Sequence, residues 1–214
     1  MSTPNPRPYR SELREAQARE TRARVLDAAA AEFADRGYAG TTLGSIAVTA
    51  GVSVETVKLQ GAKHELLLGA WQRRLPGGDR DAAPLLEDDA FRAQIAAMTD
   101  EELLGTFVAQ AAEISAVGAG LWQAFASAAR FDPHVRAAFE STIAIREAEF
   151  RLFVDLFDDR GMIANDRPRD ELAASFGFLA SAEGFAQLVG ESGLSLDAYR
   201  AWLRRAIDRL VLAG

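Results

Sequence analysis

Apolar residues recur every three or four positions along most of the chain, which is the spacing of helices that bury one face. The first such stripe runs from Val25 to Phe33, and charged residues fill the turns before it. We expect Ser11 to cap this helix and Gly37 to end it, because glycine adopts the left-handed conformation of a helix C-terminus without steric cost. The pattern therefore predicts a first helix that runs from Ser11 to about Arg36.

Two short helices joined by a tight turn follow this stripe. Thr41 or Thr42 can cap the first of them, because a hydroxyl accepts a hydrogen bond from the free N–H groups of a helix's first turn. Gly51 supplies the turn, and Ser53 caps a second helix over Val54–Gln60. This order is typical of a helix-turn-helix, whose second helix enters the major groove of DNA. A structural helical hairpin has the same order, so the layout alone leaves both interpretations open.

The surrounding residues favour the DNA-binding interpretation. Residues 21–57 closely resemble the N-terminal domain of the TetR family of transcriptional regulators. The features that match are an Arg-rich start, an apolar stripe and small or hydroxyl residues around the two short helices: Val25, Leu26, Ala29, Phe33, Gly37, Tyr38, Thr41, Thr42, Ile46, Ala47, Ala50, Gly51, Val52, Ser53 and Thr56. The remainder of the chain resembles the family only in length and helical character.

The resemblance implies a DNA-binding regulator that forms a homodimer of all-helical subunits. Its two heads would bind successive major grooves of double-stranded DNA at a palindromic operator, and its body would bind a small-molecule effector. We interpret the chain as a repressor that this effector releases. The residues expected to contact DNA lie on the first helix and around the two short helices: Arg22, Arg24, Thr41, Thr42, Ser53, Val54, Glu55, Thr56, Lys58, Leu59 and Lys63.

The sequence departs from the family's pattern after Val57. The family follows this position with a Tyr and, three residues later, a Phe; here the Tyr position holds Lys58, the Phe is absent and the segment is one residue shorter. We expect Leu59 to supply the missing apolar contact and Lys58 to reach a phosphate. The departure also motivates an alternative from another class, a helical small-molecule-binding protein with a degenerate DNA-binding head.

The second part of the chain also follows a helical pattern, which predicts an all-α fold with a C-terminal ligand-binding and dimerisation domain. Thr99 and Glu102 form a capping box, and Asp132-Pro133 is a cap followed by proline. Gly118 and Gly120 are expected to interrupt the helix between these caps. We predict three segments: a flexible basic arm with the start of the first helix at residues 1–18, the helix-turn-helix domain at 19–72 and the helical body at 73–214.

Two long helices at the end of the chain, about Pro168–Val189 and Ser195–Leu212, are expected to pair across the two-fold axis of a dimer. Small residues are frequent on the first of them, and small residues allow helices to approach closely. Antiparallel pairing of two copies would form a four-helix bundle. The other interpretation is that they complete the core of a monomer.

The distribution of charge fits contact with DNA at one end. The chain carries a net charge of −7, but residues 1–75 carry +3 and the remainder −10. There is no Cys, which excludes disulfides, and no run approaches the ~20 apolar residues of a membrane span. We therefore expect a cytoplasmic protein without a membrane partner.

The chemistry of an enzyme has no support in the sequence. The histidines are far apart, adjacent carboxylates point to different sides of a helix, and no phosphate-binding glycine loop or catalytic triad is recognisable. We expect no enzyme activity, no cofactor and no metal site. The effector is expected to bind among aromatic side chains of the body, although such a stripe is as typical of plain core packing. The candidates are Phe107, Trp122, Phe125 and Phe150.

Overall fold

The computed structural model describes residues 7–74, 89–164 and 166–212, with side chains from Arg14 onward. Every described element is helical, so the predicted all-α fold is confirmed. In chain order the helices are α1 (Arg7–Gly40), α2 (Leu43–Ala50), α3 (Val54–Gln60), α4 (Lys63–Arg74), α5 (Asp89–Ala96), α6 (Asp100–Ala129), α7 (Pro133–Asp159), α8 (Arg169–Leu179), α9 (Ala182–Phe185) with its π-helical continuation η2 (Ala186–Glu191), and α10 (Leu196–Ile207) with η3 (Asp208–Leu212).

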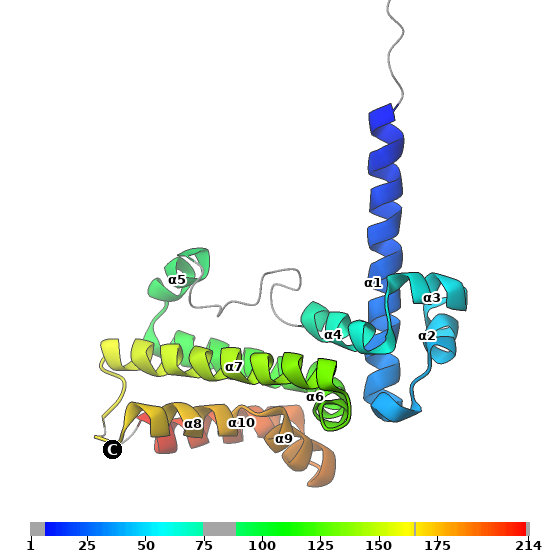
Figure 1. Ribbon diagram of the computed structural model, residues 1–214. Helices are drawn as coiled ribbons and strands as arrows, with labels where there is room; N and C mark the ends of the chain where they lie inside the picture. Colours follow the sequence, from blue (N-terminus) through cyan, green and yellow to red (C-terminus); the bar gives the residue numbers. More distant parts are fainter. Residues whose placement is uncertain (1–6, 75–88, 165, 213–214) are drawn as a thin grey trace, which may run out of the picture.

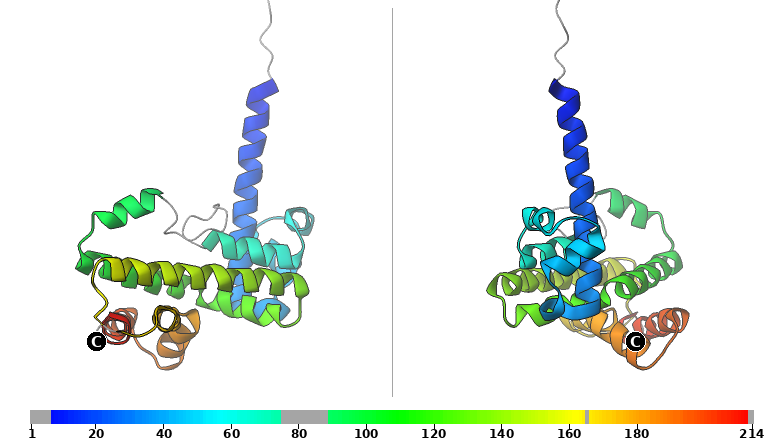
Figure 2. Two further views of the ribbon diagram at one scale, coloured as in Figure 1. Left: turned by 60° about the vertical axis from the view of Figure 1, so that its left-hand side comes forward. Right: turned by 90° about the vertical axis from the view of Figure 1, so that its right-hand side faces the viewer.

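The molecule consists of a head, α1 to α4, beside a body of stacked helices (Figure 1). α6 and α7 run side by side along the body, and α8 and α10 lie beneath them (Figures 1 and 2). The first half of α1 projects away from all the other helices, while its second half contacts α2, α4 and α6. α4, the last helix of the head, runs toward the body. This arrangement leaves α2 and α3 on the outer side of the head.

α1 begins earlier than expected. It starts at Arg7 and not at Ser11, since a proline such as Pro8 is tolerated in the first helical turn, where its missing N–H has no partner to lose. Residues 7–18 of the predicted flexible arm are therefore helical, and residues 1–6 lie outside the described part. The helix breaks at Gly37, whose φ of 67° is positive as expected of a glycine there but whose ψ of 174° is extended, and one further turn follows it.

The two short helices have the predicted limits and caps. The hydroxyl of Thr42 accepts a hydrogen bond from Ser45 N at 3.0 Å, and Ser45 Oγ accepts one from Thr42 N at 3.1 Å. Gly51 has φ 66°, and its N–H bonds back to carbonyls of α2. Ser53 Oγ accepts from Thr56 N at 3.1 Å and starts α3. Local side-chain chemistry thus sets both ends of this turn.

The head has no core separate from the body. Its fully buried residues, among them Phe33, Ile46, Val57 and Leu66, belong to one apolar cluster with Trp122 and other residues of α6. A second cluster fills the far end of the body between α5, α6, α7, α8 and α10. The apolar seam between α1 and α6 therefore joins the head to the body.

Gly118 and Gly120 do not interrupt α6, contrary to expectation. α6 is continuous from Asp100 to Ala129, and α1 crosses it beside Gly120. A Cβ at Gly120 would lie 3.1 Å from both Cβ and the carbonyl oxygen of Ala34. The glycine is needed for this close approach of two backbones and not for a break, which periodicity alone cannot distinguish.

One other helix limit in the body differs from the prediction. The expected helix over Pro168–Val189 stops at Leu179 and begins again at Ala182, because Ser181 caps a new start by accepting from Gly184 N at 3.0 Å. α5 begins at Asp89 within the described part of the chain. α7 ends at Asp159, with Gly161 two residues beyond at φ 69°.

Two helices, α6 and the stretch Arg169–Glu191, are long and apolar enough to span a membrane by length and composition alone. Core helices of soluble proteins meet the same criterion. Leu104, Phe125 and Phe176 of these helices are buried in the two clusters, whereas Val117 and Phe178 are exposed. Packing inside the molecule thus accounts for part of their composition.

The seam between α1 and α6 generates a stability prediction. Gly120→Ala should destabilise the protein by about 1–2 kcal/mol, because the new methyl group meets backbone atoms of α1 that cannot move away freely. Gly105→Ala on the same helix is the matched control. Nothing lies within 4 Å of a Cβ there, so it should stabilise the protein by up to about 1 kcal/mol. Urea unfolding measures both; equal effects of the two substitutions would contradict the close crossing.

Candidate nucleic-acid interface and body cavity

α3 presents one face to solvent while its other face fixes it to the head. Val57 is fully buried in the core, whereas Ser53, Glu55 and Lys58 are exposed. Val54 and Thr56 are partly buried, and the hydroxyl of Thr56 lies 2.9 Å from Ser53 Oγ. The predicted contact residues of this helix therefore stand on a rigid, outward-facing surface.

The two adjacent threonines before α2 have different roles. Thr42 is exposed beside the free N–H groups of the helix start, where a phosphate can be received. Thr41 is 0% exposed, and its hydroxyl donates to the carbonyls of Glu32 at 2.9 Å and Gly37 at 2.8 Å. Inclusion of Thr41 among the DNA contacts does not agree with this structure, because its only polar group is buried and bonded.

The basic side chains of the predicted interface lie in different environments. Arg22 Nη1 donates to the carbonyl of Gln60 at 3.0 Å, so Arg22 holds the end of α3. Arg24 is exposed on α1. Lys63 places its ammonium 4.6 Å from the centroid of the Tyr38 ring, and burial lowers the pKa of Lys63. Arg22 and Lys63 thus both stabilise the head in addition to any contact with DNA.

The segment that departs from the family pattern leaves its side chains in solvent. Leu59 is 84% exposed, so the expectation that it replaces the missing apolar contact is wrong; Gly61, whose φ is 140°, ends α3 immediately after Gln60 and leaves no helical turn for Leu59 to pack against. Lys58 Nζ lies 3.5 Å from Glu55 Oε1. Val48 on α2 is likewise 83% exposed. Two apolar side chains and one ion pair therefore stand on the outside of the helix-turn-helix.

Glu32 is a buried acid that the sequence reasoning missed. Its carboxylate accepts a hydrogen bond from Thr49 Oγ1 at 2.7 Å and lies 3.4 Å from Arg36 Nε. The hydroxyls of Thr49 and Ser45, with the charge of Arg36, hold the pKa of Glu32 below its ordinary value. Glu32 thereby ties α1 to α2. Its position one residue before Phe33 on the apolar stripe was the available signal.

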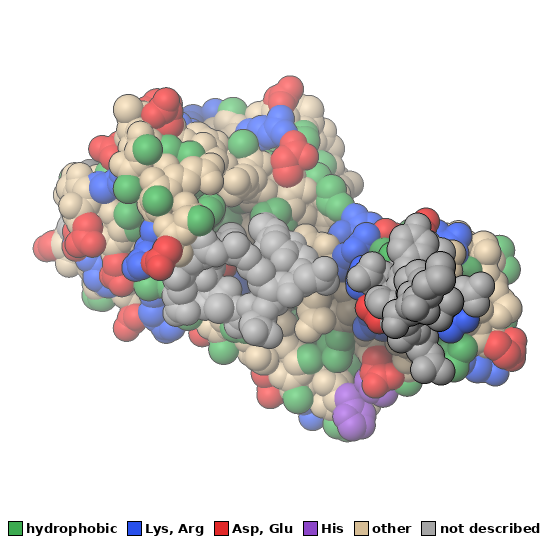
Figure 3. Space-filling view, turned by 90° about the horizontal axis from the view of Figure 1, so that it is seen from above, with side chains coloured by type: hydrophobic (Ala, Val, Ile, Leu, Met, Phe, Trp, Pro, Cys, Tyr) green, Lys and Arg blue, Asp and Glu red, His purple; other side chains and the backbone are tan. Residues whose placement is uncertain are grey.

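Polar groups also join the head to the start of α7. Tyr38 OH donates to Asp132 Oδ2 at 3.1 Å, and Asp132 Oδ1 accepts from His134 N at 3.0 Å as the cap of α7. Burial raises the pKa of Tyr38 to about 12, and the bond to Asp132 adds to the shift. His64 and His134, the two histidines of the chain, stack with centroids 5.0 Å apart at the edge of the molecule (Figure 3, purple).

The four aromatic residues predicted to bind the ligand lie in two separate apolar clusters. Trp122 and Phe125 are buried in the cluster shared with the head, while Phe107 and Phe150 pack around Phe176 in the other cluster. The four residues therefore do not line one pocket. The helical spacing could not show this, because α6 is long enough for its two ends to reach different cores.

Trp122 connects the head to two charged side chains of the body. Its ring lies 5.0 Å from that of Trp71 on α4. The guanidinium of Arg146 lies 4.7 Å from the centroid of the same ring. Trp122 Nε1 donates to Glu183 Oε1 at 2.6 Å.

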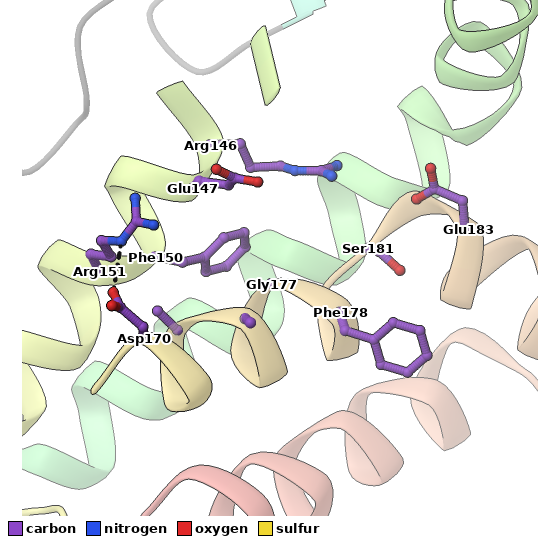
Figure 4. Close-up of a pocket in the computed structure, with 11 residues that line it drawn as sticks. Arg146, Glu147, Phe150, Arg151, Asp170, Gly177, Phe178, Ser181 and Glu183 are labelled. Carbon is purple, nitrogen blue, oxygen red and sulfur yellow. Dashed lines mark hydrogen bonds and ion pairs between the residues drawn. The ribbon is translucent and has the colours of Figure 1, made fainter. Parts of the chain in front are cut away.

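Beside these two charged groups lies a cavity of about 460 Å³ between α7 and α8 (Figure 4). Phe150 and Phe178 flank its apolar part, and Gly177 forms part of its floor. Arg146 and Glu183 lie at one end, and the ion pair of Arg151 with Asp170, 3.1 Å long, lies at the other. Of the predicted ligand residues, Phe150 alone lines this cavity, and Trp122 reaches its edge through Arg146 and Glu183. The volume is typical of small-molecule sites.

Within the described part of the chain, no three His, Cys, Asp or Glu side chains lie close enough together to hold a metal ion. Several carboxylates form ion pairs with arginines of other elements, for example Glu101 with Arg204 and Asp100 with Arg160. The first pair holds α10 to α6, and the second joins the start of α6 to the end of α7. Their geometry assigns them a structural role.

Comparison with known proteins gives a family match for part of the head and, separately, a fold match for most of the chain. Residues 25–58 match the family model described as bacterial regulatory proteins, tetR family. A comparison with curated proteins gives no significant match. Solved structures show the same fold over most of the chain.

Three of these structures illustrate the similarity. A proposed transcriptional regulator from Saccharomonospora viridis, solved in complex with choline, is 22% identical over 91% of this chain and 99% of its own, with a TM-score of 0.68. A proposed TetR-family regulator from Rhodococcus sp. is 20% identical over 90% and 98%, with a TM-score of 0.64. Another from Mesorhizobium loti is 21% identical over 91% and 94%, with a TM-score of 0.58.

The carboxylate of Glu32 generates a pH prediction. Because its pKa is lowered in the folded head, its contribution to stability is present above about pH 4.5 and is lost as the pH falls through its folded pKa. Glu32→Gln should therefore lower the urea midpoint at pH 7, and the difference from wild type should shrink toward pH 3. Glu20→Gln, an exposed change on the same helix, is the control and should match wild type at both values. A deficit of Glu32→Gln that is equal at pH 7 and pH 3 would contradict the assignment.

Proposed function

We propose that this chain, whose head is of the TetR family and whose fold is that of TetR-family transcriptional regulators, is a ligand-responsive repressor. The observation that carries the proposal is α3. Its caps, its buried Val57 and the bond from Arg22 fix it to the head, while Ser53, Glu55 and Lys58 face solvent. A fixed helix with an exposed polar face is what entry into a major groove requires.

The DNA contacts divide by chemistry. Val54 and Thr56, near the start of α3, are the proposed readers of base edges, Val54 through a thymine methyl group. Thr42 and Lys58 are the proposed phosphate contacts, because a helix N-terminus and a compact ammonium both suit a phosphate oxygen. Repression would follow from obstruction of a promoter by the bound protein.

We propose a homodimer that binds a palindromic operator. Two copies related by a two-fold axis would place their α3 helices about one helical turn of DNA, ~34–36 Å, or a multiple of it apart. Exposed Phe178 on α8 and Leu210 on η3 support an interface on the last helices. Of the small residues expected there, Ala173 and Gly177 face the body and Ala174 faces solvent, so only part of that stripe is available to a partner.

We place the effector in the cavity between α7 and α8. Trp122 contacts both its charged end and Trp71 on α4, so a molecule in the cavity lies two side chains from the head. The Saccharomonospora viridis relative was solved with choline, which supports small-molecule binding in this fold. A regulator of this kind acts where the chromosome is, and we propose a cytoplasmic location.

The alternative, a binding protein with a degenerate head, also has an observation in its favour. The missing aromatic residues are not replaced by a buried side chain, since Leu59 stands in solvent, and Lys58 pairs with Glu55. Binding of the protein to DNA from beside its own coding region, at low salt, separates the two. A shifted band that competitor DNA of unrelated sequence does not abolish supports the repressor; no shift with any such fragment supports the alternative.

Lys58 provides a test of the contact assignment. Lys58→Ala should weaken binding to operator and unrelated DNA about equally and reduce the slope of log K against log salt by about 1, because one phosphate contact is lost. Fluorescence anisotropy over a salt series gives both quantities. Thr56→Ala is the matched variant on the same helix, and it should lower the preference for operator while leaving the salt slope unchanged. Loss of operator preference in Lys58→Ala at the wild-type slope would show that Lys58 reads bases.

Substitution of an exposed alanine by glutamate tests whether α10 lies in the dimer interface. Ala201→Glu on α10 should shift the protein toward monomer, since two copies of the new charge would be buried near each other across the two-fold axis. Ala109→Glu on α6 is an equally exposed control and should leave the dimer intact. Sedimentation velocity measures both. A dimer of unchanged affinity in Ala201→Glu would remove α10 from the interface.

A further inference from the structure

The charged groups around the cavity between α7 and α8 differ in whether they already have partners. Arg151 and Asp170 pair with each other. Glu183 accepts the indole N–H of Trp122. Arg146 has no carboxylate within 4.0 Å among the described residues, and its charged group lies over the Trp122 ring. Arg146 is thus the cation of the lining without a close ion pair, although the charges of Glu183 and Glu147 act on it from a greater distance.

The surroundings of Arg146 make an anion the favoured partner. The side chain is half-buried, and the removal of water lowers the pKa of its guanidinium. A charge partly removed from water interacts more strongly with a partner that reaches it than a solvated charge does. Glu147, the neighbouring acid, is exposed, so water screens its repulsion of an incoming anion. A guanidinium also matches a carboxylate geometrically, through two parallel hydrogen bonds.

The rest of the cavity suits an apolar body. Phe150 packs against Gly177, whose hypothetical Cβ would meet the Phe150 ring at 3.0 Å. Phe178 is 74% exposed beside it, and Ala173 and Ala174 complete this apolar side. In Figure 4 the Phe150 ring lies between Arg146 and Gly177, so the charged end and the apolar slot are continuous.

We propose that this cavity binds a small amphipathic carboxylate, whose carboxylate group pairs with Arg146 and whose apolar part lies against Phe150 and Phe178. The proposal rests on the proposed function, because it names the chemical class of the effector of that same site. Glu147 and Glu183 make a cationic amphiphile the competing class. A bound cation would place its charge beside Arg146, which is less screened than either acid.

Calorimetric titration of the full-length protein with three probes of one chain length tests the class. The probes are octanoate, octan-1-ol and octyltrimethylammonium. Wild type should bind octanoate at least about tenfold more tightly than octanol, as expected for a hydrogen-bonded charge pair. Arg146→Gln should abolish that preference, Arg146→Lys should retain part of it, and Arg151→Gln, which changes the paired arginine at the other end, should retain it fully.

Three results would overturn the proposal: equal affinity of wild type for octanoate and octanol, tighter binding of octyltrimethylammonium, or a preference that survives Arg146→Gln. Absence of binding by all three probes would also overturn it. DNA binding measured without any probe distinguishes a failure of this proposal from a failure of the proposed function. Wild type and Arg146→Gln should bind DNA alike; failure of both to bind DNA would contradict the proposed function, whatever the probes do.

Discussion

The close crossing of α1 over α6 joins the head of the molecule to its body. It brings Gly120 against Ala34, and it places Phe33 and Leu121 in a single apolar cluster. Because that cluster is shared, the head and the body cannot be separated without exposure of the core to water. Tyr38, bonded to Asp132, and the packed rings of Trp71 and Trp122 strengthen the same junction. The orientation of α3 is therefore fixed relative to the body.

The same junction lies between the proposed effector cavity and the proposed DNA-binding helix. The cavity lies between α7 and α8, and its polar end touches Trp122 through Arg146 and Glu183. Trp122 in turn packs on α4, the helix that leads into the head. A ligand that draws Arg146 away from the Trp122 ring changes the contacts of one residue in the shared core.

Much of the fold was predictable because local chemistry determines it. The caps at Thr42, Ser53, Thr99 and Asp132 and the left-handed Gly51 lie where the sequence places them. Features that depend on contacts between distant residues were not predictable. The sequence could not reveal that Gly120 serves a helix crossing, that Thr41 is buried or that the aromatic candidates belong to two cores. Arg146 and Glu32 were missed for the same reason, since each is defined by partners on other helices or turns.

In the proposed dimer, each head reads one half of a palindromic site. Selection of binding sites from random double-stranded DNA, with the full-length protein, tests this arrangement. We expect enrichment of an inverted repeat whose half-sites have one spacing, because heads joined rigidly to dimerised bodies would not adjust their separation. Enriched half-sites at variable spacing would contradict the rigid junction, and a selection without any enriched sequence would contradict DNA recognition itself.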